Sequence, residues 1–177
     1  MKDVMVDLET LATTADSVIM SIGAVIFDIK TGEISDSGFY RSISIESNLE
    51  IGRRISEDTL RFWMKQGADA KDVFEENKVS LARGLTDFKE WLPDTPTMWS
   101  NGADFDLPMM ALAYTQLGQP IPWKYWNSRC FRTYKKLPGA NAVNIPFLGT
   151  KHNALADALH QAKTVIAIEA KLFGALQ

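Results

Sequence analysis

"VMVDLETLAT", residues 4–13, places two carboxylates at the end of an apolar segment. Its first three residues have no polar face, which is typical of a strand covered on both sides near the middle of a sheet. Because side chains alternate between the faces of a strand, Asp7 and Glu9 point to the same side as Met5, and Leu8 points to the other side. Two like charges in a partly desolvated place repel, and a divalent metal ion is the simplest partner that would stabilise them. A strand that ends at Leu8 and leaves both acids in solvent is the alternative interpretation.

The whole chain has the composition of an ordinary globular protein. Its 177 residues, 46% of them hydrophobic and 23% charged, predict a single domain over residues 1–177. We expect no signal peptide and no membrane span, because acids interrupt the early apolar runs and no run approaches the roughly 20 residues that a span needs. The single cysteine, Cys130, favours a reducing, cytoplasmic setting. A net charge of −3 argues against a non-specific nucleic-acid binder, so any nucleic acid should bind at a local site where metal ions supply much of the positive charge.

The pattern of elements predicts an α/β fold with a mixed sheet. Two β-branched segments follow the first strand and should form an antiparallel three-strand meander with it. A later short strand, reached through helices, should run parallel to the first, and helices flank the sheet. Residues 119–151 give no clear prediction. The expected strands after the first cover 17–29, 36–45 and 96–101, and the expected helices cover 55–67, 69–77, 78–92, 106–118 and 153–174.

Two further stretches place acids near predicted helix starts. Asp104 and Asp106 precede the helix at 106–118, where helix capping accounts for one Asp comfortably and for two less well. Asp157 lies near the start of the last helix among Ala and Leu residues, five positions after His152. An isolated Asp in such a helix is more often an exposed residue than a functional one. The interpretation therefore depends on the three stretches together.

Taken in order, the three acidic stretches resemble the motifs of the DEDD superfamily of 3′–5′ exonucleases, which are DnaQ-like and have an RNase H-like fold. The D-x-E motif is Asp7-Leu8-Glu9, and the N-x-x-F-D motif is similar to Asn101 through Phe105-Asp106, with one extra residue. The H-x4-D motif runs from His152 to Asp157.

The resemblance extends nearly from end to end and selects a subclass. The tyrosine variant of the third motif would have Tyr where this chain has Asn153, so the histidine subclass, DEDDh, is the match. The segment "SEDTLRFWMKQ" (56–66) is similar to that of the small phage and prophage exonucleases and of the mycobacterial-type 3′–5′ exoribonuclease. The resemblance places the acid of the second motif at Asp106 rather than Asp104.

The resemblance implies a metal-dependent 3′–5′ exonuclease. Such an enzyme hydrolyses the terminal phosphodiester of single-stranded or 3′-overhang RNA or DNA and releases nucleoside 5′-monophosphates. Two Mg²⁺ or Mn²⁺ ions, which prefer oxygen ligands and bind phosphate oxygens, would stabilise the attacking and leaving oxygens. His152 would be the general base. The implied metal ligands, with Asp7 as the bridging carboxylate, are Asp7, Glu9, Asp106 and Asp157.

The resemblance also implies where substrate binds. Thr10 and Leu11 should meet the terminal nucleotide, and Phe105 should stack on a base or wedge beside it. Trp63 is a second candidate for stacking, although an aromatic residue in an amphipathic helix is more often part of the core. The basic run at 132–137 contacts phosphates or is a solvated surface.

Several alternatives stay open at this point. A non-catalytic nucleic-acid or nucleotide-binding module on the same fold would be free to lose the acids and His152, which are intact here. A metal-dependent phosphatase would use similar acids without the H-x4-D order and would favour mononucleotides. A proofreading subunit would share the chemistry and differ in its partners. The resemblance suggests a homodimer, and the sequence does not separate RNA from DNA as the substrate.

Overall fold

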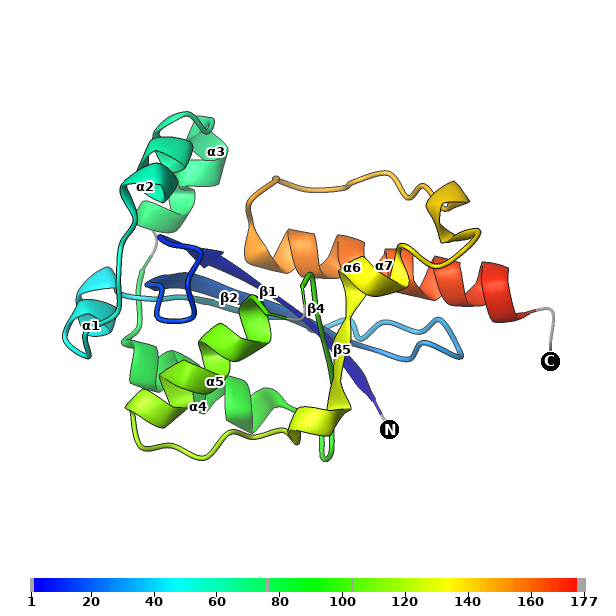
Figure 1. Ribbon diagram of the computed structural model, residues 1–177, viewed down its shortest axis with the longest axis horizontal. Coiled ribbons are helices and arrows are strands. Elements are labelled where there is room, and N and C mark those ends of the chain that lie inside the picture. The colour runs from blue at the N-terminus through cyan, green and yellow to red at the C-terminus, as the bar shows by residue number, and fades with distance from the viewer. Residues whose placement is uncertain (1, 76, 103, 175–177) are drawn as a thin grey trace.

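A five-stranded mixed sheet forms the centre of the computed structural model, which describes residues 2–75, 77–102 and 104–174 (Figure 1). The strand order is β3-β2-β1-β4-β5. β1 pairs antiparallel with β2 and parallel with β4, β2 pairs antiparallel with β3, and β4 pairs parallel with β5. This arrangement confirms the predicted RNase H-like mixed sheet. The strands are β1 (Asp3–Thr10), β2 (Ile19–Phe27), β3 (Phe39–Ser42), β4 (Thr97–Ser100) and β5 (Ser128–Cys130).

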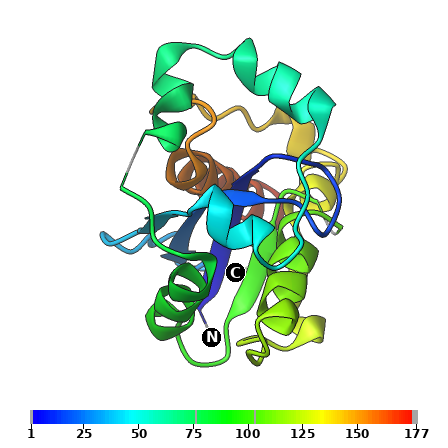
Figure 2. The ribbon, with the colours of Figure 1, turned by 90° about the vertical axis from the view of Figure 1, so that its left-hand side faces the viewer.

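Helices cover both faces of the sheet. α7 (Ala154–Phe173) lies on one face, and α4 (Leu81–Trp91) and α5 (Asp106–Gln116) lie on the other (Figures 1 and 2). A group of short helices stands over the end of the sheet at which β1 finishes (Figure 1). That group comprises α1 (Ile45–Leu49), α2 (Glu57–Met64), α3 (Ala68–Lys71) and the 3-10 turn η1 (Asp72–Phe74). Among the described residues, no helix has the length and apolar character needed to span a membrane.

The two faces of β1 carry different chemistry, as the period-two pattern predicts. Val4, Val6 and Leu8 pack into the cluster under α4 and α5, whereas Met5 packs with Ala158 of α7. Both clusters are buried, so β1 is covered on both sides. Because Asp7 and Glu9 share the face of Met5, their carboxylates point toward the α7 side of the sheet.

α7 lies unusually close to β2 because β2 has a glycine at the point of approach. A Cβ atom built on Gly23 would lie 2.1 Å from the carbonyl carbon of Ala154, the first residue of α7. Gly23 is also the residue opposite Asp7 in the β1–β2 register. The missing side chain therefore lets the first turn of α7 rest on the sheet beside Asp7.

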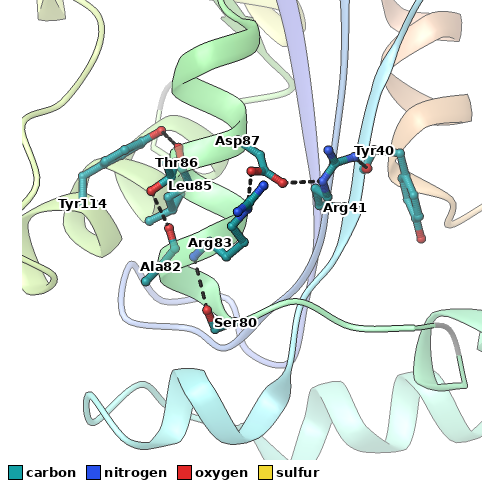
Figure 3. A network of polar contacts seen from close by, with 9 residues as sticks. All are labelled: Tyr40, Arg41, Ser80, Ala82, Arg83, Leu85, Thr86, Asp87 and Tyr114. Carbon is teal, nitrogen blue, oxygen red and sulfur yellow. Dashed lines mark hydrogen bonds and ion pairs between the residues drawn. The ribbon is translucent and has the colours of Figure 1, made fainter.

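A polar network fastens the opposite layer. The carboxylate of Asp87 in α4 accepts hydrogen bonds from Arg41 Nε of β3 at 2.7 Å and from Arg83 Nε at 2.5 Å (Figure 3). The hydroxyl of Tyr114 in α5 donates to the carbonyl of Leu85 in α4 at 2.7 Å. These contacts tie α4 to the sheet edge and to α5, which fixes the helix that begins at Asp106.

The segment for which the sequence gives no clear prediction contains the fifth strand. β5 has three residues, and it is preceded by η2 (Tyr125–Asn127) and followed by α6 (Phe131–Tyr134) and η3 (Ala140–Ala142). From η3 the chain runs back along α7 to the start of that helix (Figure 1). This return brings residues just before α7, including His152, to the end of the sheet where β1 finishes.

Candidate active site

Three of the predicted ligands meet where β1 ends and α7 begins. Asp7 and Glu9 lie on β1, and Asp157 lies in the first turn of α7. One carboxylate oxygen from each of the three lies within 4.8 Å of the other two. Glu9 is buried, and Asp7 and Asp157 are partly buried. The close packing of α7 at Gly23 is what brings the third acid to the two acids of the strand.

The fourth acid, Asp106, joins this group from the other side of the sheet. It is the first residue of α5, is only 2% exposed, and accepts a hydrogen bond from the backbone N–H of Leu8 at 3.2 Å. Leu8 stands between Asp7 and Glu9, so this bond ties the α5 start directly to the acidic end of β1. Asp104 is exposed in the preceding loop. The structure therefore brings Asp106, and not Asp104, to the cluster.

Burial raises the pKa values of all four acids, and repulsion from neighbouring acids adds to the shift for Asp7 and Glu9. The pKa of Asp7 lies well above its usual range because of burial and the charges of Asp106, Glu9 and Asp157. Burial, followed by the charges of Asp157 and Asp106, raises the pKa of Glu9 to about 8. Burial raises the pKa of Asp106 to about 7 despite backbone hydrogen bonds from Leu8 and Asn101. Burial likewise raises the pKa of Asp157, against the hydrogen bond from His152.

The contrast with Asp87 shows what the cluster lacks. Hydrogen bonds from Arg41 and Arg83 lower the pKa of the Asp87 carboxylate, although this side chain is also buried. Among the residues that the structure describes, no lysine or arginine forms an ion pair with any of the four clustered acids. Four carboxylates without a bound positive partner fit a site for divalent cations, because carboxylate oxygens are the ligands that such cations prefer.

His152 is held beside the cluster by backbone and ring contacts. Its backbone N–H donates to Asp157 Oδ2 at 3.0 Å, so a hydrogen bond joins the first and last residues of the third motif. Its φ of 62° lies in the left-handed region, which costs free energy for a residue with a Cβ. The imidazole packs edge-on against Phe62 and Trp63 of α2, with ring centroids 5.2 Å and 6.1 Å away. α2 therefore forms the wall that supports the predicted base.

A hollow of about 430 Å³ opens between the end of β1, α2 and His152. Four of the residues predicted for this region line it: Thr10, Trp63, Phe105 and His152, together with the ligand Glu9. A hollow of similar volume lies between α5 and residues 121–128, but none of the four acids lines it. The hollow beside the acids is therefore the place where the end of a substrate would lie.

Two of the predicted substrate contacts occupy different positions from those expected. Leu11 is 1% exposed and packs in the core cluster with Val18 and Met20, so its side chain does not line the hollow. Trp63 does line the hollow, but it is 3% exposed and its Nε1–H donates to the carbonyl of Thr10 at 2.9 Å. The indole is thus a fixed part of the wall rather than an open platform for stacking.

Two residues of the site were missed by the sequence reasoning. Phe62 is 43% exposed and lines the hollow, so it offers the aromatic surface that Trp63 does not. Gln161 of α7 is buried, and its Nε2 donates to Asp7 Oδ1 at 2.7 Å. The one available signal for Gln161 was a polar residue one helical turn after Asp157 on an otherwise apolar, alanine-rich face. Phe62 gave no signal beyond its place next to Trp63.

Comparison with known proteins agrees with this geometry. Residues 2–169 match the family model of the 3'-5' exoribonuclease Rv2179c-like domain. No curated protein matches the chain.

Solved structures of nucleases share the fold. The nuclease domain of 3'hExo, a DEDDh family member bound to rAMP, is 15% identical with a TM-score of 0.60, over 98% of this chain and 92% of that one. Cell-death related nuclease 4 (CRN-4) is 12% identical with a TM-score of 0.58, and a full-length 3'-exonuclease is 15% identical with a TM-score of 0.57. The matches cover 97% and 98% of this chain but only 64% and 61% of those two proteins.

Proposed function

The chain belongs to the family of 3'-5' exoribonuclease Rv2179c-like domains and is a DEDDh-type 3′–5′ exonuclease, and on this premise we propose its substrate and mechanism. The substrate is single-stranded RNA or the single-stranded 3′ end of a duplex, and the products are nucleoside 5′-monophosphates. One observation carries the proposal: three carboxylates meet within 4.8 Å, with Asp106 and His152 beside them, at the edge of a hollow open to solvent.

The residues present fit two divalent cations. The donor set is made of carboxylate oxygens, its acids are partly or fully buried, and their raised pKa values indicate that a positive charge would stabilise them. Bound Mg²⁺ or Mn²⁺ supplies charge that stabilises the attacking and leaving oxygens at phosphorus. The residues that would hold the ions are Asp7, Glu9, Asp106 and Asp157.

The chain's own residues orient the substrate and move the proton. His152, at the rim of the hollow, takes the proton from the attacking water, and its imidazole is oriented by the edge-on contacts with Phe62 and Trp63. Thr10 and Phe105 contact the terminal nucleotide from the floor of the hollow, and Phe62 offers its exposed ring to a base. Base stacking tolerates any sequence, so we expect little sequence preference.

A digestion time course tests the proposal. The substrates are 5′-labelled single-stranded RNA, single-stranded DNA and duplexes with a 3′ overhang, each with Mn²⁺ or Mg²⁺ and with a chelator. We expect a ladder that shortens from the 3′ end, that is fastest on RNA and that disappears on chelation. Asp106→Asn should slow cleavage by at least about 100-fold, because it removes one ligand charge from a site that acts through charge stabilisation.

Asp104→Asn is the matched control, because it removes an exposed carboxylate from the loop before α5, two residues away. Its rate should stay within about two-fold of the wild type. Tight metal-dependent binding of the oligomers without cleavage would contradict the exonuclease and support a non-catalytic binding module. Release of inorganic phosphate from mononucleotides, with intact oligomers, would leave the phosphatase. A single domain over residues 1–177, a homodimer and a cytoplasmic location stay predictions.

A further inference from the structure

A buried glutamine stands behind the acidic cluster. Gln161 lies one helical turn after Asp157 on the face of α7 that packs on the sheet, and it is 5% exposed. Its neighbours on this face are small or apolar residues, among them Ala158, Ala162 and Val165. A polar amide is unexpected on this buried apolar face, since Leu or Met would fill similar space.

The amide of Gln161 makes one strong contact and leaves one atom unpaired. Nε2 donates to Asp7 Oδ1 at 2.7 Å, and within the described part of the chain no other side chain donates to the Asp7 carboxylate. Oε1 is buried, and no donor from the described residues reaches it. A buried acceptor without a donor costs free energy, so packing alone does not account for the amide.

The contact fixes the orientation of Asp7. Asp7 faces three other carboxylates, and the repulsion among them favours rotation of its side chain away from the cluster. A donor on Oδ1 holds the carboxylate against this repulsion. Flipping the amide would place Oε1 against the anionic oxygen, so the donating orientation is the one that an ionised Asp7 selects.

We propose that Gln161 is a positioning residue that holds the Asp7 carboxylate in the orientation in which it binds divalent ions together with Glu9 and Asp157. The inference rests on the proposed function, because it concerns the same metal site. Hydrogen-bond partners of metal ligands commonly change metal affinity or activity by 10–100-fold when they are mutated. In this role Gln161 changes metal affinity through its hydrogen bond to Asp7 and is not itself a ligand.

Direct Mn²⁺ binding to the full chain tests the proposal without relying on cleavage. Gln161→Met keeps the length of the side chain and removes the donor, and calorimetry with Mn²⁺ alone should give a Kd raised by about 10-fold or more. RNA cleavage should fall at limiting Mn²⁺ and recover toward the wild-type rate as Mn²⁺ is raised. Gln161→Asn keeps the amide but is one methylene shorter, and it should weaken Mn²⁺ binding as well.

Thr164→Val is the matched control. Thr164 is buried in α7, and its hydroxyl donates to the carbonyl of His160 at 2.8 Å without touching the acids. Its Mn²⁺ affinity should equal that of the wild type, and thermal unfolding with chelator should show that each variant is folded. An unchanged Mn²⁺ Kd in Gln161→Met would overturn the proposal even if the wild type cleaves RNA. If the wild type binds Mn²⁺ but cleaves nothing, the proposed function fails, while the Kd values still decide the role of Gln161.

Discussion

At the scale of single residues, Glu9 shows how the site trades stability for chemistry. Burial and two neighbouring acids raise the pKa of its carboxyl from 4.5 to about 8. The metal-free folded state therefore binds a proton on Glu9 that the unfolded chain releases above about pH 4.5. The contribution of this proton to the free energy of unfolding is complete below about pH 4.5 and is lost as the pH rises through about 8. The proposed function requires the ionised, destabilised form of Glu9, because only a carboxylate would bind a metal ion there.

We predict that Glu9→Gln stabilises the metal-free protein while it abolishes cleavage. The amide has nearly the shape of the acid and no charge, so the free energy of unfolding near pH 8.5 should rise by about 2 kcal/mol and Tm by roughly 4–8 °C. Near pH 5, where Glu9 is already protonated, the variant and the wild type should unfold at nearly the same temperature. Thermal unfolding followed by circular dichroism in chelator measures both values.

Asp104→Asn separates this effect from a general loss of negative charge. It removes one charge from an exposed position, and its Tm should follow that of the wild type at both pH values. Equal Tm values for Glu9→Gln and the wild type near pH 8.5 would show that the Glu9 carboxylate is not destabilised in the metal-free protein.

At the scale of elements, the site depends on how closely α7 approaches the sheet. We predict that Gly23→Ala pushes the start of α7 away from the sheet, because the new methyl group would overlap the backbone of Ala154. Backbone cannot yield as a flexible side chain does, so the variant should lose about 3 kcal/mol of stability and roughly 6–12 °C in Tm. Displacement of the first turn of α7 would also move Asp157 away from Asp7, and Mn²⁺ affinity by calorimetry should fall with Tm.

Gly67→Ala is the control for a glycine replacement. A Cβ at Gly67 meets nothing within 4 Å, and its φ of −66° suits alanine. Its Tm should change by less than about 2 °C. If Gly23→Ala kept the Mn²⁺ affinity of the wild type despite a lower Tm, the close approach of α7 would serve packing alone.

Some elements of the fold could be predicted from the sequence and others could not. The face shared by Met5, Asp7 and Glu9 follows from the period of a strand, and β1 confirms it. β5 was missed because its three residues, largely exposed, carry no periodic pattern. The contact of Gln161 with Asp7 joins residues 154 positions apart in the chain, and no local pattern reports such a contact.

The buried face of α7 also could not be predicted in full from the sequence, because it consists mainly of small residues. The buried face of α7 is built on alanines such as Ala154, Ala158 and Ala162, while the larger Leu155 and Leu159 are only partly buried beside it. A small-residue face allows the helix to lie near the strand backbone, and Gly23 on β2 completes the fit. A pattern of hydrophobic residues alone would assign the buried face to the leucines. It therefore predicts the helix but not how closely the helix approaches the sheet.

At the scale of the whole molecule, the charge balance limits how nucleic acid can bind. The net charge is −3, and four of the acids gather where the substrate end would lie. Arg132, from the basic run at 132–137, is exposed and donates to the carbonyl of Asn101 at 2.8 Å, in the loop that leads to Asp106. Because the chain is acidic and four carboxylates gather at the site, we expect bound metal ions to supply most of the attraction for phosphates.

We predict that RNA binding depends strongly on divalent ions and weakly on monovalent salt. For single strands, log K falls with log salt with a slope of about −0.7 for each phosphate that the protein neutralises. With about two such contacts, the slope between about 50 and 300 mM KCl should be near −1.4. It is measured in Mn²⁺ by fluorescence anisotropy with single-stranded RNA and the His152→Ala variant, which lacks the proposed base and keeps the four carboxylates. In chelator, binding should weaken by about 10-fold or more, since no metal ion then supplies the positive charge that attracts the phosphates to the acidic site. A slope steeper than about −4 that persists in chelator would contradict this, because it would require a basic track for the strand outside the acidic site.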